Sequence, residues 1–166
     1  MAGTDEIRAF LSEVRAFQEF TASELSALAG SLREKSLRKG QVLLRMGDTS
    51  DEMYIVRRGS LVISKPVTGR VEQVLARVGQ GDFFGEMALF DHSPRSATVQ
   101  AESDALLLVL DRGALERLTE QDPRAAAAFY RAMVLEFVQR LRASGDLVAE
   151  VTRWGLEATG LDVESR

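Results

Sequence analysis

The chain has 166 residues, which suffices for one domain with a buried core. Its composition, 45% hydrophobic and 28% charged, is ordinary for a soluble globular protein, and a net charge of −4 argues weakly against a nucleic-acid surface. The chain has no cysteine and a single histidine, which excludes disulfides, thiol catalysis and thiolate metal sites and disfavours a zinc site or a Ser–His relay.

Residues 5–34 are predicted to form two short helices. Phe20, Thr21, Glu24 and Leu25 have the spacing of a capping box with a hydrophobic staple. The second helix should therefore begin at Thr21 and run to about Glu34.

From residue 35 to residue 110 the pattern changes to short apolar runs bounded by turn residues. The clearest runs are residues 41–44, 53–56, 61–63 and 105–110. Many short strands at this spacing predict a sandwich or a barrel.

Two helices are predicted after the strands, each with a recognisable start. Asp111 should be the N-cap of a helix over residues 112–120, and Asp122 followed by Pro123 gives a cap with proline at the first helical position. The second helix is predicted to run to about residue 151, with Gly155 and Gly160 keeping the tail, residues 152–166, out of any long helix.

This long helix carries an apolar seam with alternating steps of four and three residues: Tyr130, Val134, Phe137, Leu141, Ser144, Val148 and Val151. A second stripe, formed by Ala126, Phe129 and Met133, is placed to pack on the chain's own strands. A helix with two apolar faces can bury one in its protomer and the other against a partner, so we predict a homodimer through this helix. The alternative is a helix that lies on its own barrel with one wide apolar face.

The most informative segment is residues 85–98, where an acidic and a basic residue flank a short apolar run. Glu86 follows Gly85 at a predicted helix start, residues 87–89 should form one tight turn packed inward, and Arg95 precedes a β-rich run. An arginine fork fits paired phosphate oxygens, as do backbone N–H groups at a helix start, and a carboxylate accepts from sugar hydroxyls. The segment therefore suits a ligand that carries both a ribose and a phosphate. Taken alone, Glu86 could instead complement a helix N-terminus and Arg95 could form a surface ion pair.

Residues 84–89, FGEMAL, and residues 94–99, PRSATV, resemble the phosphate-binding cassette of cyclic nucleotide-binding domains. Such domains occur in cAMP-dependent kinase regulatory subunits, nucleotide-gated channels and catabolite activator proteins. The resemblance covers about residues 5–151 and implies an α+β fold in one domain, residues 1–151. That fold is an antiparallel β-roll, or jelly-roll barrel, with N-terminal helices, a short cassette helix and a long C-terminal helix.

In the resembling family the glutamate holds the ribose 2′-hydroxyl and the arginine holds the cyclic phosphate, roles that carry over to Glu86 and Arg95. The resemblance implies no catalytic or metal-binding residue. The implied ligand-binding set is Phe84, Gly85, Glu86, Met87, Ala88, Arg95, Ser96, Ala97 and Ser144.

Ser96 and Ser144 bear on the choice of base. A hydroxyl at Ser96 can contact the phosphate, but it does not decide between cAMP and cGMP. Ser144 matches a position where activators of the family meet the adenine, although Gly145 replaces the second hydroxyl there; its other interpretation is a polar break that sets the helix register. Trp154 is interpreted as an anchor for the tail rather than a cap on the base, and His92 as a solvated loop residue.

What is missing decides the predicted class of protein. Activators of this family continue into a helix-turn-helix, for which residues 152–166 are too few, and we expect no specific DNA binding. No stretch approaches the ~20 apolar residues of a membrane span, no signal segment opens the chain, and no enzyme, cofactor or metal motif is present. We therefore predict a stand-alone cytoplasmic receptor for cAMP, or for cGMP, that signals to an unidentified protein by a change of shape. The alternatives are a structural dimerisation module with a vestigial pocket, or the sensor half of a transcription regulator without its DNA-binding domain.

Overall fold

The computed structural model describes residues 3–158, and the chain divides into two compact units between Phe129 and Tyr130. The first unit opens with α1 (Thr4–Glu13), a 3-10 turn η1 (Arg15–Phe17) and α2 (Ala22–Gly30). Thr21 caps α2 as predicted: its hydroxyl accepts from the Glu24 amide at 3.2 Å, and the Glu24 carboxylate accepts from the Thr21 amide at 2.9 Å.

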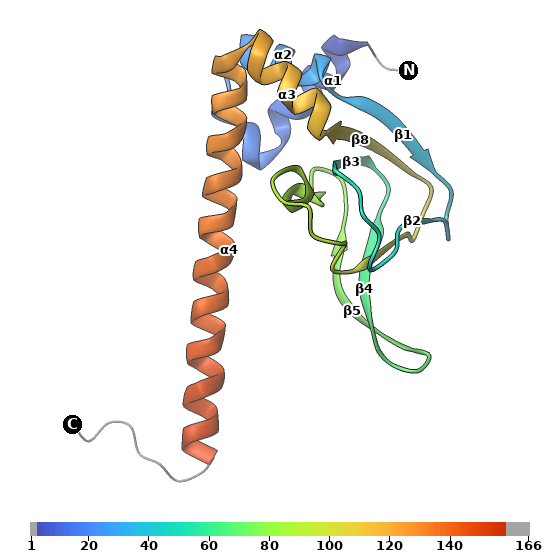
Figure 1. Ribbon diagram of the computed structural model, residues 1–166, viewed down its shortest axis with the longest axis vertical. Coiled ribbons are helices and arrows are strands. Elements are labelled where there is room, and N and C mark those ends of the chain that lie inside the picture. Colours follow the sequence, from blue (N-terminus) through green and yellow to red (C-terminus); the bar gives the residue numbers. More distant parts are fainter. Residues whose placement is uncertain (1–2, 159–166) are drawn as a thin grey trace, which may run out of the picture. The chain divides into compact units, whose positions relative to one another are not determined.

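Two four-stranded antiparallel sheets follow the helices (Figure 1). The first has the order β1-β8-β3-β6 and consists of β1 (Arg33–Leu37), β8 (Ala105–Asp111), β3 (Glu52–Arg58) and β6 (Phe83–Phe84). The second has the order β2-β7-β4-β5 and consists of β2 (Val42–Leu44), β7 (Thr98–Ala101), β4 (Leu61–Thr68) and β5 (Val71–Val78). The short turn η2 (Glu86–Leu89) lies between β6 and β7 in the chain.

The core forms between the sheets because alternate side chains of both point inward. Tyr54 and Val56 on β3, Leu107 and Val109 on β8, and Val99 on β7 belong to one buried cluster. The intervening residues of the same strands, Met53, Ile55, Leu108 and Leu110, are buried as well. Strands β3 and β8 are therefore covered on both faces, which explains their continuous apolar sequences.

Two helices follow β8. Helix α3 (Arg112–Gln121) is capped by Asp111, whose carboxylate accepts from the Ala114 amide at 2.8 Å. Helix α4 (Pro123–Ala158) is capped by Asp122, whose carboxylate accepts from the Ala125 amide at 3.0 Å. Both predicted starts are confirmed. Within residues 3–158, no helix combines the length and apolarity that crossing a membrane requires.

Two predicted helix ends were wrong. Helix α2 stops at Gly30 instead of Glu34, because residues from Arg33 onward pair with β8, Arg33 opposite Val109 and Leu37 opposite Ala105. Helix α4 continues past residue 151 to Ala158, through Gly155. A glycine inside a helix costs only about 0.5–1 kcal/mol relative to alanine, so it need not end one. Gly160 and the rest of the predicted tail lie outside the described residues.

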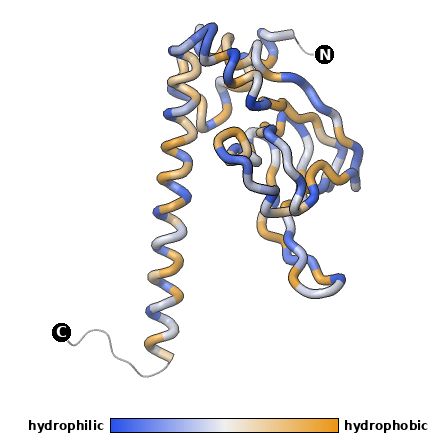
Figure 2. Tube along the Cα trace, viewed as in Figure 1, coloured by the Kyte–Doolittle hydropathy of each residue, from blue (hydrophilic) through white to orange (hydrophobic). Residues whose placement is uncertain are grey.

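The predicted single domain over residues 1–151 stays a prediction, and the structure has two compact units. The first turns of α4 belong to the first unit, where Phe129 stacks on Phe17 with ring centroids 6.5 Å apart. Over its described residues, 130–158, the second unit is the rest of α4, along which apolar and polar residues alternate (Figure 2). Several of its apolar side chains are exposed, among them Val134, Leu141, Val148 and Val151.

Candidate functional site

The predicted cassette begins where β6 ends at Gly85. Strand β6 pairs with β3, Phe84 opposite Tyr54, and Gly85 then turns the chain into η2 with a φ of 77°. A Cβ atom on Gly85 would lie 2.9 Å from the Arg95 Nη1 atom and 3.1 Å from the Glu52 carbonyl oxygen. Glycine is thus required here both by the left-handed backbone and by the close approach of the Arg95 side chain and the Glu52 backbone.

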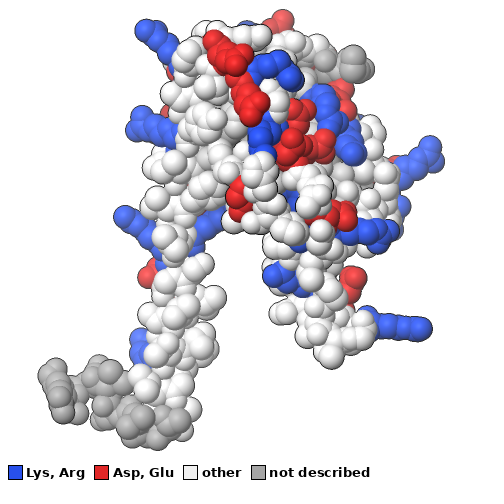
Figure 3. Space-filling model, in the orientation of Figure 1, with Lys and Arg blue, Asp and Glu red and all other residues white. Residues whose placement is uncertain are grey.

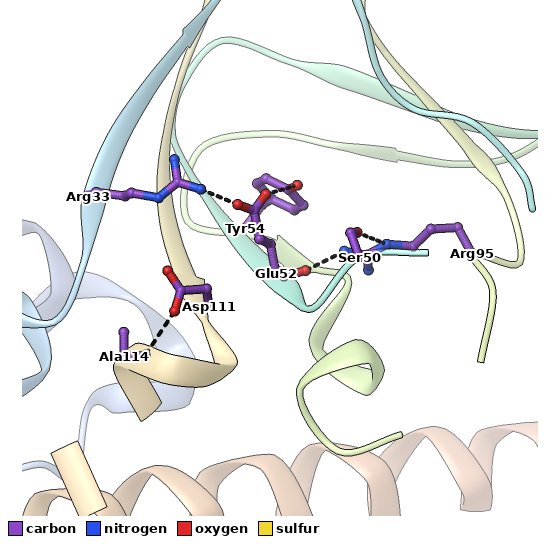
Figure 4. A network of polar contacts seen from close by, with 7 residues as sticks. All are labelled: Arg33, Ser50, Glu52, Tyr54, Arg95, Asp111 and Ala114. Atoms are coloured by element: carbon purple, nitrogen blue, oxygen red, sulfur yellow. Dashed lines mark hydrogen bonds and ion pairs between the residues drawn. The ribbon is translucent and has the colours of Figure 1, made fainter. Parts of the chain in front are cut away.

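Arg95 lies inside this site, with a relative exposure of only 8%. Its Nε atom donates to the Ser50 hydroxyl at 2.8 Å and its Nη2 atom to the Glu52 carbonyl at 2.6 Å (Figure 4). Its Nη1 atom donates to the Gly85 carbonyl at 3.2 Å. All three acceptors are neutral, so the interpretation of Arg95 as a surface ion pair was wrong. A guanidinium has five N–H donors, and within residues 3–158 these bonds leave one donor on Nη1 and one on Nη2 for a further acceptor. A buried cation with two uncommitted, adjacent donors favours an anionic partner.

The backbone of Arg95 is held as firmly as its side chain. Its amide donates to the Asp48 carbonyl at 2.7 Å, and its carbonyl accepts from the Gly47 amide at 2.9 Å. The loop between β2 and β3 therefore fixes Arg95 at the main chain, and the same loop supplies Ser50 to the side chain.

Behind the guanidinium lies an aromatic pair. The Tyr54 ring centroid is 5.9 Å from the Arg95 Cζ atom, and the Phe84 ring stacks on Tyr54 with centroids 5.2 Å apart. The Tyr54 hydroxyl donates to the Glu52 carboxylate at 2.5 Å. Burial, reinforced by this bond, raises the pKa of Tyr54 well above its usual value. Phe84, predicted to contact ligand, is buried in the core, where it supports Tyr54.

The turn η2 buries three of its four side chains. Glu86 is 3% exposed, and Ala88 and Leu89 are buried too. Met87, however, is 62% exposed, so the prediction that residues 87–89 all pack inward was wrong for this side chain. A 3-10 turn has three residues per turn, which aligns Glu86 with Leu89 and leaves Met87 on a different side.

The far end of η2 is held by Arg112, the first residue of α3. Its Nη2 atom donates to the carbonyls of Ala88 and Asp91 at 2.6 and 2.8 Å, and its Nε atom donates to Leu89 at 3.3 Å. The exposed His92 ring contacts the same guanidinium, with its Nδ1 atom 2.7 Å from Nη1. Both residues line a polar pocket of about 350 Å³ together with Thr49, Ser50 and Asp51. Among residues 3–158, no group of three or more acidic or histidine side chains could hold a metal ion.

The structure thus brings together Phe84, Gly85, Glu86 and Arg95, with Ser96 exposed and Ala97 half-buried beside them. Ser144 and Trp154 lie on α4 in the second unit, and the contact of Ser144 with a base stays a prediction. Sequence reasoning missed Ser50, Glu52, Tyr54 and Arg112. One available signal was Tyr54, since a tyrosine in an otherwise aliphatic buried strand needs a partner for its hydroxyl.

Replacing Gly85 by alanine tests how tightly the site is built. We expect Gly85→Ala to destabilise the protein by about 1–2 kcal/mol from the left-handed backbone alone, with further loss from the approach to Arg95. Thermal unfolding measures this, and Gly69→Ala is a matched control because its φ of 60° is also left-handed but a Cβ there meets nothing within 4 Å. Equal effects of the two substitutions would contradict the close contact at Gly85.

Comparison with known proteins places these features in context. The family model for the cyclic nucleotide-binding domain matches residues 34–122. A solved N-terminal domain of a transcriptional regulator from Streptomyces coelicolor A3(2) is 31% identical, with a TM-score of 0.72, covering 84% of this chain and 94% of that one. A solved cyclic nucleotide-binding domain from Methylobacillus flagellatus KT is 26% identical, with a TM-score of 0.75, covering 89% and 83%. These likenesses confirm the predicted α+β fold with its antiparallel β-roll.

Two curated relatives are similar over shorter parts of their length. A cAMP-dependent protein kinase regulatory subunit from Debaryomyces hansenii is 32% identical over 124 residues, 70% of this chain and 26% of the relative. A cGMP-dependent protein kinase from Toxoplasma gondii is 33% identical over 113 residues, 68% of this chain and 11% of the relative. The chain therefore spans about a quarter or less of the length of these relatives.

Proposed function

The chain belongs to the cyclic nucleotide-binding domain family, and we propose that it is a receptor for a 3′,5′-cyclic nucleotide, cAMP in the first place. The observation that carries this proposal is the buried Arg95, held by three neutral acceptors with one N–H left on each terminal nitrogen. A cyclic phosphate has one negative charge and two oxygens that such a pair of donors can hold.

Glu86 completes the proposed recognition. Its carboxylate, at the start of η2, accepts from the ribose 2′-hydroxyl, while Ser96, directly after Arg95, offers a hydroxyl to the phosphate. The remaining members of the predicted set on the cassette are proposed to line the ligand around Glu86 and Arg95: Phe84, Gly85, Met87, Ala88 and Ala97. Neither Glu86 nor Arg95 is proposed to act as nucleophile or base, so the site binds its ligand without catalysis.

Choice of the base is the finer part of the proposal. The relatives include both a cAMP-dependent and a cGMP-dependent kinase protein, so the competitor is cGMP. We assign the preference for cAMP to Ser144 on α4, whose hydroxyl would meet the adenine.

The signal is proposed to leave the site as a change of shape. Ligand that tightens the cassette would move η2, and Arg112 joins the end of η2 to the first turn of α3 through three carbonyl contacts. We propose that the chain forms a homodimer through the α4 seam. We propose further that a cytoplasmic downstream protein binds differently after this change of shape. Figure 3 shows basic side chains interspersed with acidic ones on the face drawn, which supports a partner other than nucleic acid.

A second candidate is the sensor part of a transcription regulator. The likeness to the N-terminal domain of a transcriptional regulator favours it. In that case the site has the same ligand, and a DNA-reading domain in the same protein would take the place of a separate downstream partner. The third possibility, a structural module with a vestigial pocket, differs from both because it binds no nucleotide.

Titration calorimetry against cAMP, cGMP and linear 5′-AMP tests the proposal. We expect one site per protomer, cAMP tighter than cGMP, and linear AMP far weaker because it has a doubly charged phosphate and no cyclic diester. Cyclic nucleotide at 100 times its dissociation constant should raise the free energy of unfolding by about 2.7 kcal/mol in a thermal scan. No heat of binding and no thermal shift with either cyclic nucleotide would leave the vestigial module as the function.

A further inference from the structure

Two residues of strand β3, Glu52 and Tyr54, contact the Arg95 guanidinium and also contact each other. The Tyr54 ring lies 5.9 Å from the Arg95 Cζ atom, and the Glu52 carbonyl accepts from the Arg95 Nη2 atom at 2.6 Å. The Glu52 carboxylate in turn accepts from the Tyr54 hydroxyl at 2.5 Å and pairs with Arg33 on β1 (Figure 4). Glu52 thus holds the arginine with its backbone and the tyrosine with its side chain.

We propose that Tyr54 and Glu52 are positioning residues for Arg95: they fix the guanidinium before ligand arrives, so that its two uncommitted N–H donors meet the cyclic phosphate together. This inference rests on the proposed function, because the cyclic phosphate is the ligand that Arg95 would hold. It adds residues that no family motif in the cassette contains.

Holding Arg95 in place before binding should raise affinity, because an arginine side chain has many accessible rotamers. An unrestrained arginine populates many rotamers, and ordering it during binding reduces affinity. Here Phe84, Tyr54 and Arg95 form a stack in which the buried ring pair supports one face of the guanidinium. The hydroxyl bond to Glu52 keeps the Tyr54 ring in that stack, and because the pKa of Tyr54 is raised, the phenol stays a donor through neutral pH.

The contribution of each residue to nucleotide affinity should decrease with the number of contacts that separate it from the Arg95 guanidinium. Tyr54 touches the guanidinium directly, its hydroxyl acts one step away, and Arg33 acts two steps away through Glu52. Arg33 is also half-exposed, which weakens its ion pair with Glu52. A merely structural role for Tyr54 would not produce this order in nucleotide affinity.

Calorimetric titration with cAMP tests the gradation. We expect Tyr54→Leu to weaken binding about three- to thirtyfold and Tyr54→Phe about two- to tenfold, with Arg33→Gln within about twofold of the parent. Arg77→Gln is the control. Arg77 forms its ion pair, 3.0 Å long, with Glu102 and not with a member of this network, so the substitution should leave affinity for cAMP unchanged. In an Arg95→Ala background, Tyr54→Phe should have no further effect.

Two results would overturn the inference. One is parental cAMP affinity in Tyr54→Leu; the other is an equal loss from Tyr54→Phe whether or not Arg95 is present, which would mean that Tyr54 acts on the fold. Tyr54→Phe guards against failure of the leucine variant to fold, because it keeps the buried ring.

A second measurement needs no nucleotide. In the ¹⁵N-arginine spectrum of the ligand-free protein, the Arg95 Nε–H that donates to Ser50 should exchange slowly with water, faster in Tyr54→Phe and fastest in Tyr54→Leu. An exchange rate that neither substitution changes would refute the positioning role. If the parent binds no cyclic nucleotide, the proposed function fails, and this spectrum still decides whether Tyr54 and Glu52 hold Arg95.

Discussion

Arg95→Ala should weaken cyclic nucleotide binding roughly ten- to 150-fold, the largest effect we expect from a single substitution in the site. Hydrogen bonds to a charged group contribute about 1.5–3 kcal/mol, and removing the arginine strips the only predicted cation from the phosphate. The loss should be greater than for Glu86→Ala, because Glu86 accepts from a neutral hydroxyl. Titration calorimetry with cAMP on both variants measures the difference.

The controls for this experiment come from the same chain. Arg77→Ala removes an exposed arginine from the other sheet and should leave affinity unchanged. Arg95→Lys keeps the charge but loses the fork and two of the three bonded nitrogens, so it should fall between Arg95→Ala and the parent. Circular dichroism verifies that each variant folds. If Arg95→Ala bound cAMP as tightly as the parent, the assignment of the phosphate site would be wrong.

The local features of the fold were predictable because their signals are local. Thr21 with Glu24, Asp111, and Asp122 with Pro123 each mark a helix start within a few residues, and the structure has all three caps. Strand β1 was missed for the opposite reason. Residues 33–37 are mostly polar and have no strand pattern, and only their pairing with the buried β8 makes them a strand.

The residues of the site also fall into those that a local motif predicts and those that only long-range pairing brings in. The cassette motif pointed to Glu86 and Arg95; both are buried, and Arg95 lies against Gly85, while their contact with a ligand stays a prediction. The acceptors that hold Arg95 were not predictable, because Ser50 and Glu52 lie 45 and 43 residues away in the chain. Their identity follows from the pairing of β3 with β6 and from the path of the β2–β3 loop, which no local pattern specifies.

The dimer seam was predicted from periodicity alone, and its strongest test is a charge in its middle. Leu141 is 74% exposed on α4, between the seam residues Phe137 and Ser144. Burying a leucine contributes about 1.5–3 kcal/mol, and a twofold dimer would lose two such contacts and gain two facing carboxylates. Leu141→Asp should therefore raise the dimer dissociation constant by at least about 100-fold. Light scattering over a concentration series measures it, with Gln139→Asp as the control that adds the same charge off the seam.

The Leu141→Asp substitution also tests whether dimer formation through the seam and nucleotide binding are coupled. Ser144 lies on the seam and is proposed to meet the base, so ligand and partner would bind to one helix. Where the two events are coupled, each changes the affinity for the other by the same factor. We expect Leu141→Asp to lower cAMP affinity as well as dimer strength, whereas Ser144→Ala should leave the dimer intact and mainly reduce the preference for cAMP over cGMP. Calorimetry and light scattering on both variants decide the matter. A monomeric Leu141→Asp protein with parental cAMP affinity would show that the seam and the cassette are energetically independent, and the signal would then have to leave through η2, Arg112 and α3 alone.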